Sequence, residues 1–159
     1  MSFFRSRKVA PVTSDFLLEC KDLVRHYGQI KPVDGVSLNL RPHELLSILG
    51  PSGCGKSTLL NLIAGLDEPQ AGEIFIGGEE MSSVHHIVAP ELRRVGMVFQ
   101  DIALFPHLNV FKNVAYGLNG SKDEKRSRVE EMLKLVELSG SEKKMPRELS
   151  GGEQQRIAI

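Results

Sequence analysis

A glycine-rich segment at residues 50–58 has the residue types and spacing of a phosphate-binding loop. Glycines let the backbone come close to a ligand, so that successive N–H groups form a concave nest for an anion. Lys56 supplies a positive charge for the β- and γ-phosphates of a nucleotide, and the Ser57 hydroxyl is a ligand for Mg²⁺. The predicted nucleotide-binding residues of this loop are Gly50, Ser52, Gly53, Cys54, Gly55, Lys56, Ser57 and Thr58.

The segments on either side of this loop fit such a site. Glu44–Leu49 is mostly apolar and predicts a short buried strand that runs into the loop. Thr58–Ala64 predicts a helix, and Gly65 follows it as a C-terminal stop. A helix that begins at the loop directs the positive end of its dipole at the bound phosphates.

A second glycine-rich segment, Leu149-Ser150-Gly151-Gly152-Glu153, precedes the last residues of the chain. Ser150 and Glu153 form a capping box, so a helix is predicted to begin here. Two glycines in a first turn destabilise a helix relative to alanine. They also leave exposed N–H groups, which suit a second phosphate contact.

The rest of the chain predicts short strands and turns. Strands are expected at Phe16–Tyr27, Val33–Leu40, Glu73–Ile76 and Val95–Gln100. Residues 81–92 are expected to be irregular, and a solvated loop is favoured over a metal site for the adjacent His85 and His86.

Two helices are expected before the second glycine-rich segment. Asn109 is a predicted cap for a short helix that extends through Asn113 and Tyr116 to Gly117. Ser121 and Glu124 form a capping box ahead of a longer helix that Gly140 ends. The apolar face of this longer helix is Val129, Met132, Leu133 and Val136.

Composition sets broad limits on the fold and partners. A chain of 159 residues is expected to form one domain, and 20 basic against 20 acidic residues give no global signal for nucleic acid or anionic membrane. The two cysteines, Cys20 and Cys54, have no metal-type spacing, which favours a reducing setting. Residues 1–14 are expected to be a flexible basic tail, and no apolar run approaches the ~20 residues of a membrane-spanning helix.

The order of four motifs resembles the nucleotide-binding subunit of ATP-binding-cassette (ABC) transporters. These motifs are Tyr27, GPSGCGKST at 50–58, VFQ at 98–100 and LSGGE at 149–153. The resemblance implies an α/β phosphate-loop NTPase fold over residues 15–159. Its parts would be a RecA-like core sheet with helices, an antiparallel β subdomain and a helical subdomain at residues 101–148.

The resemblance also implies roles for single residues. Tyr27 would stack on adenine. Gln100 would contact Mg²⁺ and the attacking water, and Lys56 and Gln100 would act in catalysis. Ser150, Gly151, Gly152 and Glu153 would bind ATP held by a second copy in a head-to-tail dimer. Residues 101–148 would dock onto a transmembrane permease subunit.

Residues 96–108 are similar to the ferric iron importers of this family. The expected function is thus an ATP-hydrolysing import subunit, peripheral on the cytoplasmic face of the inner membrane, with ferric iron as solute. Importers for polyamine, sulfate, thiamine or sugar are the alternatives. A GTPase or small-molecule kinase is less favoured, because the chain has no guanine-reading sequence. A non-transport ABC ATPase that acts on DNA or the ribosome is also less favoured, because the chain lacks the long coiled coil of the DNA-repair members.

The chain departs from the family pattern in one respect. The Walker B strand with its Asp, the catalytic Glu, the D-loop and the switch histidine are expected after Ile159. We therefore expect a fold that is incomplete at its C-terminus, and little or no ATP hydrolysis by this polypeptide. In this form the chain would be a non-hydrolysing nucleotide-binding fragment.

Overall fold

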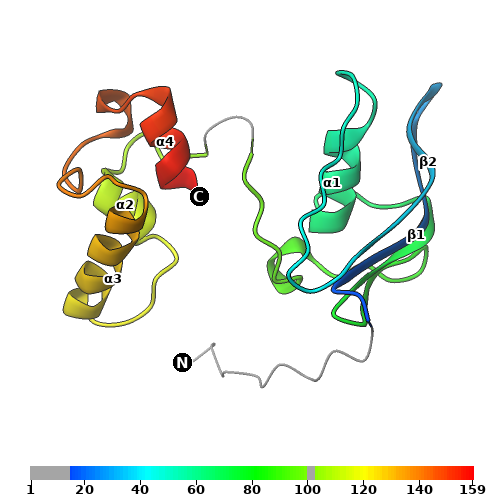
Figure 1. Cartoon of the computed structure of the whole chain (residues 1–159), viewed down its shortest axis with the longest axis horizontal. Helices are drawn as coiled ribbons and strands as arrows, with labels where there is room; N and C mark the ends of the chain where they lie inside the picture. The colour runs from blue at the N-terminus through cyan, green and yellow to red at the C-terminus, as the bar shows by residue number, and fades with distance from the viewer. Residues whose placement is uncertain (1–14, 100–102) are drawn as a thin grey trace. The chain divides into compact units, whose positions relative to one another are not determined.

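The computed structural model describes residues 15–99 and 103–159. The chain divides into two compact units, residues 1–96 and 97–159. Figure 1 shows a sheet with a helix beside it in the first unit and a group of helices in the second.

The first unit contains a four-stranded antiparallel sheet with the order β2-β1-β3-β4. Its strands are β1 (Leu18–Tyr27), β2 (Ile30–Leu40), β3 (Ala71–Ile76) and β4 (Glu79–Ser82). The three expected strands in this region are confirmed, and β2 begins three residues earlier than expected. Sequence reasoning missed β4. Gly77 and Gly78 both have positive φ, as a two-residue hairpin turn requires. This glycine pair could therefore have predicted a further strand after β3.

Helix α1 (Lys56–Ala64) packs against this sheet and forms the core of the first unit. Figure 1 shows α1 beside β1 and β2. The buried side chains of the core are Cys20, Leu23, Val33, Leu59, Leu62, Ile63, Ile74 and Met81. Gly65 ends the helix as predicted, with φ 81°. Its N–H donates to Leu62 O, and the N–H of Leu66 donates to Asn61 O, which together form a Schellman motif.

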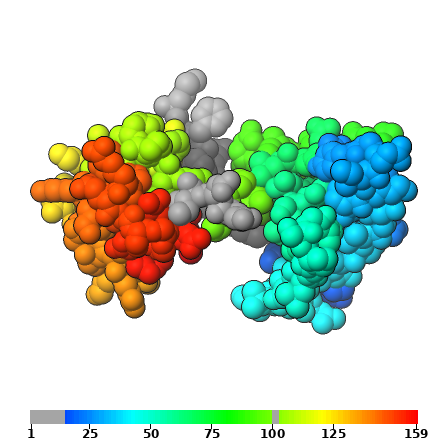
Figure 2. All heavy atoms as spheres, turned by 90° about the horizontal axis from the view of Figure 1, so that it is seen from above, coloured from blue at the N-terminus to red at the C-terminus, as the bar shows by residue number. Residues whose placement is uncertain are grey.

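Two expected strands are wrong. Residues 44–49 and 95–99 are irregular, and the exposed fractions of Leu45 and Leu49 are 92% and 90%. In Figure 2 the segment around residue 50, in cyan, lies at the surface of its unit. A buried parallel strand forms hydrogen bonds with neighbouring strands, and helices pack on both faces of its sheet. In the part of the chain that the structure describes, the four paired strands are all antiparallel and include neither segment.

The connection from β4 onward carries the two adjacent histidines. Ser82 forms an isolated bridge with Ile87, and a 3₁₀ helix, η1 (Pro90–Leu92), follows. His85 and His86 are exposed on this connection. Within residues 15–99 and 103–159, no three His, Cys, Asp or Glu side chains form a group that could hold a metal ion.

The second unit is built from α2 (Val110–Val114), α3 (Lys122–Leu135), η2 (Pro146–Glu148) and α4 (Gly151–Ala158). Its buried core is Val110, Val129, Leu133, Leu138 and Leu149. The side chain of Asn109 accepts from Lys112 N, and the box of Ser121 and Glu124 is formed, so both predicted N-caps are confirmed. Among the described residues, no helix is both long enough and apolar enough to cross a bilayer.

The ends of α2 and α3 differ from expectation. Helix α2 ends at Val114, before Tyr116 and Gly117. Helix α3 ends at Leu135 rather than at Gly140. Glu137 has φ 58° and donates to Lys134 O, while the N–H of Leu138 donates to Leu133 O. This is again a Schellman motif, and burial of Leu138 against the core explains why a glutamate holds the left-handed position that glycine prefers.

Candidate functional site

The phosphate loop lies between residue 49 and the first turn of α1. Gly53 and Gly55 have φ of 81° and 96°, values that L side chains rarely adopt. A Cβ at Gly55 would overlap the carbonyl oxygen of Pro32 in β2. Residues 50–54 are exposed. Both glycines thus allow the backbone of an open loop to turn, and Gly55 also lets it approach β2 closely.

The ammonium of Lys56 closes the loop. Its Nζ donates to Gly50 O over 2.8 Å and to Pro51 O over 2.6 Å, and it lies 3.6 Å from the Sγ of Cys54. These acceptors are neutral, so the positive charge has no carboxylate partner in the loop. A phosphate oxygen that replaces the two carbonyls gains a charge-assisted hydrogen bond.

The first turn of α1 suits an anion. Lys56, Ser57 and Thr58 open the helix, and the first intrahelical bond is Leu59 N to Gly55 O at 2.9 Å. The N–H groups of a first turn have no intrahelical acceptor, and this turn contains no acidic side chain. Ser57 is exposed, so its hydroxyl is accessible to a Mg²⁺ ion that phosphate oxygens and water also coordinate. The residues present thus fit a magnesium–nucleotide complex.

A buried arginine anchors the other end of α1. Arg93 is 1% exposed, and its guanidinium donates to four neutral oxygens. These are Val88 O, Leu62 O, Ile63 O and Ser82 Oγ, at 2.6–3.1 Å. A cation at the C-terminus of a helix is favourable because it meets the negative end of the dipole. Burial lowers the pKa of Arg93.

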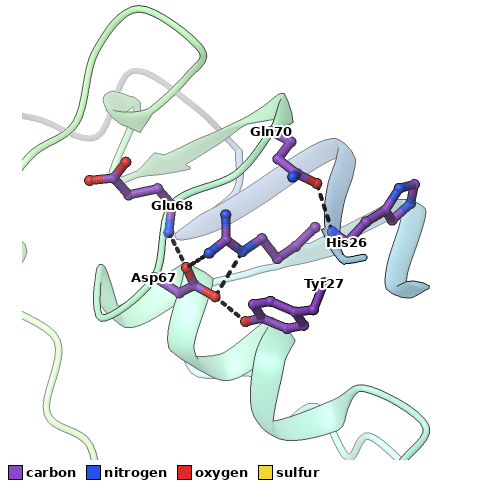
Figure 3. A network of polar contacts seen from close by, with 6 residues as sticks. His26, Tyr27, Asp67, Glu68 and Gln70 are labelled. Carbon is purple, nitrogen blue, oxygen red and sulfur yellow. Dashed lines mark hydrogen bonds and ion pairs between the residues drawn. The ribbon is translucent and has the colours of Figure 1, made fainter. Parts of the chain in front are cut away.

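Tyr27 lies at the end of β1 in a polar cluster (Figure 3). Its hydroxyl donates to the carboxylate of Asp67, and the residue is 44% exposed. The guanidinium of Arg25 lies 4.8 Å from the ring centroid of Tyr27 and binds both carboxylate oxygens of Asp67. Burial favours the neutral form of Asp67. The hydrogen bonds from Tyr27 and the Glu68 amide, with the charge of Arg25, outweigh it and lower the pKa of Asp67.

The second glycine-rich segment begins α4. The Ser150 Oγ accepts from Glu153 N at 3.3 Å, and the Glu153 carboxylate accepts from Ser150 N at 2.7 Å. The predicted capping box is confirmed, and hydrogen bonds from the Ser150 side chain and backbone lower the pKa of Glu153. Gly151 and Gly152 are exposed, and their N–H groups stand in the helix's first turn.

The structure thus brings together the loop and the first turn of α1 in the first unit, which also contains Tyr27. It places Ser150–Glu153 in the second unit. Gln100 lies outside the described residues, so its role stays a prediction. Sequence reasoning missed Arg25, Asp67 and Arg93. The sequence could have indicated a role only for Arg25. Residues two apart on a strand lie on the same face, so Arg25 is expected beside Tyr27.

Comparison with known proteins gives a consistent result. The family model described as "ABC transporter" matches residues 33–159. The chain is 44% identical over 161 residues to the spermidine/putrescine import ATP-binding protein of Methylococcus capsulatus, which covers 99% of this chain and 41% of that protein. It is 47% identical over 142 residues to the Fe(3+) ions import ATP-binding protein of Brucella abortus, covering 87% of this chain and 39% of that protein.

Among solved structures, a dimeric bacterial ABC transporter cassette aligns with a TM-score of 0.78 and 37% identity. The alignment covers 89% of this chain and 67% of that cassette. The predicted α/β phosphate-loop NTPase fold is therefore confirmed. The chain spans about two-fifths of the length of the two curated relatives above.

Proposed function

This chain belongs to the ABC transporter family, and on that premise we propose that it is the ATP-binding part of an import system. ATP binding and hydrolysis by the whole protein would drive uptake of a solute through permease subunits. The protein would be peripheral on the cytoplasmic face of the inner membrane. The observation that carries this proposal is the glycine loop joined to an acid-free helix N-terminus, with the Lys56 ammonium inside the loop.

Each part of the loop would have its own task in nucleotide binding. The N–H groups of residues 53–58 would surround the phosphates, and Lys56 would exchange its two carbonyl acceptors for phosphate oxygens. Ser57 would hold Mg²⁺, which neutralises charge on the phosphates when bound. Tyr27 would stack on the adenine. Gln100 would contact Mg²⁺ and the attacking water.

The second glycine-rich segment would serve another copy of the chain. Ser150, Gly151, Gly152 and Glu153 would bind the ATP held by a second subunit in a head-to-tail dimer. What supports this is the capped first turn of α4, whose two glycines leave its backbone N–H groups accessible. A dimer of a related cassette is also among the solved structures that resemble this chain.

Calorimetry of MgATP binding tests the phosphate site. Lys56→Ala should weaken MgATP binding by roughly ten- to a hundredfold, because it removes a charge-assisted contact to the phosphates. Lys134→Ala, which removes an exposed lysine from the last turn of α3, is the matched control and should leave affinity unchanged. Equal affinities for the native chain and Lys56→Ala, with both folded, would exclude this loop as the phosphate site.

For the solute we propose ferric iron. The relative in Brucella abortus, an Fe(3+) ions import protein, supports it at 47% identity. A polyamine is the second candidate, because the spermidine/putrescine import relative aligns over 99% of this chain. Uptake of radiolabelled Fe³⁺ and spermidine by cells with and without the gene distinguishes them. Loss of spermidine uptake alone would exclude iron.

A further inference from the structure

Asp67 joins two parts of the first unit that a nucleotide would contact at opposite ends, one through its side chain and one through its backbone. Its side chain accepts a hydrogen bond from the hydroxyl of Tyr27 at the end of β1, as Figure 3 shows. Its backbone N–H donates to Asn61 O over 3.3 Å, in the last turn of α1. Helix α1 begins at the phosphate loop. Asp67 thus links the helix that carries the loop to the ring at the end of β1.

Arg25 completes the link. Its Nε and a terminal nitrogen bind the two Asp67 carboxylate oxygens at 3.1 and 2.8 Å. The same guanidinium covers one face of the Tyr27 ring. Tyr27 nevertheless remains 44% exposed, so the residue stays accessible to a ligand. With its hydroxyl bound and one face covered, the ring is held in a single orientation.

A ring held in this way would favour stacking with a base. A free aromatic side chain loses rotamer freedom when it immobilises against a ligand, and a preorganised one has already lost it. A nucleotide also has a limited span between its base and its phosphates. Its two ends bind together only where the platform and the loop have the correct separation.

We propose that Asp67 is a positioning residue for purine nucleotide binding, which acts through Tyr27 and Arg25 to fix the base platform relative to the phosphate loop. The proposal rests on the proposed function, since it takes ATP as the ligand and Tyr27 as the base platform. Asp67 itself contacts the platform and not the nucleotide. Its removal therefore affects the base end of the ligand and leaves the phosphate end unchanged.

Calorimetry of the whole chain with two ligands distinguishes binding of the base from binding of the phosphates. MgATP uses the platform and the loop, whereas magnesium tripolyphosphate has no base and uses the loop alone. Asp67→Asn should weaken MgATP binding by about three- to tenfold, the cost of immobilising a free side chain. It should leave tripolyphosphate binding unchanged. Asp34→Asn, which breaks the exposed contacts of Asp34 with His26 and Lys31, is the matched control and should leave both affinities unchanged.

A double-mutant cycle shows whether Asp67 acts through the ring. Tyr27→Phe keeps the ring but loses the hydroxyl, so it should weaken MgATP as much as Asp67→Asn does. The double variant should be no weaker than either single variant. Additive losses would overturn the proposal, because Asp67 would then act by another route.

The ring itself gives a direct readout. The chain has two tyrosines, Tyr27 and Tyr116, so ring-labelled tyrosine gives two sets of NMR signals that Tyr27→Phe assigns. Asp67→Asn should shift and sharpen the Tyr27 ring signals and leave those of Tyr116 in place.

Tyr27→Ala separates failure of this proposal from failure of the proposed function. It should weaken MgATP about five- to a hundredfold if the ring stacks on the base. A loss in Tyr27→Ala with native affinity in Asp67→Asn would overturn the positioning role alone. Native MgATP affinity in Tyr27→Ala would overturn the base platform as well, and only loss of the Lys56→Ala effect would overturn the phosphate site.

Discussion

The buried guanidinium of Arg93 donates from Nη1 to the carbonyl oxygen of Leu62 over 2.9 Å. This contact joins the C-terminus of α1 to residues that follow β4. The same guanidinium occupies the space next to Gly65, where a Cβ would overlap it. Gly65 therefore has two requirements, a positive φ and no side chain. The Arg93 guanidinium thus holds the C-terminal end of the helix that begins at the phosphate loop, and all of its hydrogen-bond acceptors are neutral oxygens.

We expect Arg93→Ala to destabilise the chain by about 3 kcal/mol or more. It removes the guanidinium donor from Ile63 O and Val88 O, and each such loss costs about 1–3 kcal/mol, whereas Leu62 O keeps the N–H of Gly65. Urea unfolding measures the change. Arg94→Ala, at the exposed neighbouring position, is the control and should alter stability by less than about 0.5 kcal/mol. Equal effects of the two substitutions would contradict the anchoring role.

A pair of alanine substitutions tests how closely the phosphate loop approaches the sheet. The methyl group of Gly53→Ala would extend into open space, so the only cost to stability is the strain of a positive φ, about 1–2 kcal/mol. Gly55→Ala has that strain and also overlaps Pro32 O, so it should destabilise the chain clearly more in thermal unfolding. A smaller effect at Gly55 than at Gly53 would mean that the loop can move away from β2 at little cost.

Local patterns in the sequence predicted those parts of the structure that local interactions determine. The glycines at 53 and 55 have the positive φ that the loop requires, and the three N-terminal caps, Asn109, Ser121 and Ser150, all accept the expected N–H. Each of these features depends on residues within a few positions of one another. The sequence alone is therefore sufficient to place them.

Contacts between distant residues could not be predicted in this way. Apolar character suggested strands at 44–49 and 95–100, but a strand exists only where a neighbour supplies hydrogen bonds. Arg93 contacts Leu62, which lies 31 residues away in the sequence, and Asp67 contacts Arg25, which lies 42 residues away. Nothing near either residue in the sequence indicates its partner. The positioning elements of the site are therefore the part that required the structure.

The two thiols should differ sharply in reactivity. Cys20 is 1% exposed, and burial, with a smaller effect of Glu19, raises its pKa to about 12. Cys54 is exposed in the phosphate loop. Because the thiolate is the reactive form, a maleimide at pH 7 should label one thiol per chain, and peptide mapping should place it at Cys54. MgATP should slow this labelling, and Cys54→Ser should abolish it. Fast labelling of Cys20 in the folded chain would contradict the packing of the β-sheet core.

The ionised form of Asp67 should stabilise the chain at neutral pH and lose this effect in acid. Its pKa is lowered in the folded state relative to the ordinary value of about 3.9, so the folded chain binds its proton less readily than the unfolded chain does. The stabilisation is complete above the unfolded pKa and is lost as pH falls through the folded pKa. In urea titrations, Asp67→Asn should be less stable than the native chain at pH 7, and this difference should shrink as pH falls through the folded pKa of Asp67. A constant difference between the two at all pH values would contradict the ionised contact.

Alanine at Gly152 should separate the stability of α4 from its proposed role in a dimer. The position is in the first turn, and a Cβ there meets open space, so the helix should gain up to about 1 kcal/mol from the better helix former. The same methyl group covers the N–H groups that would contact a phosphate of the second subunit, so dimerisation in MgATP should weaken. Thermal unfolding and light scattering with and without MgATP measure the two effects. Ser127→Ala, at an exposed position in α3, is the control that should stabilise its helix and leave dimerisation unchanged. A Gly152→Ala chain that is more stable and dimerises as the native chain does would show that the glycines serve only the helix start.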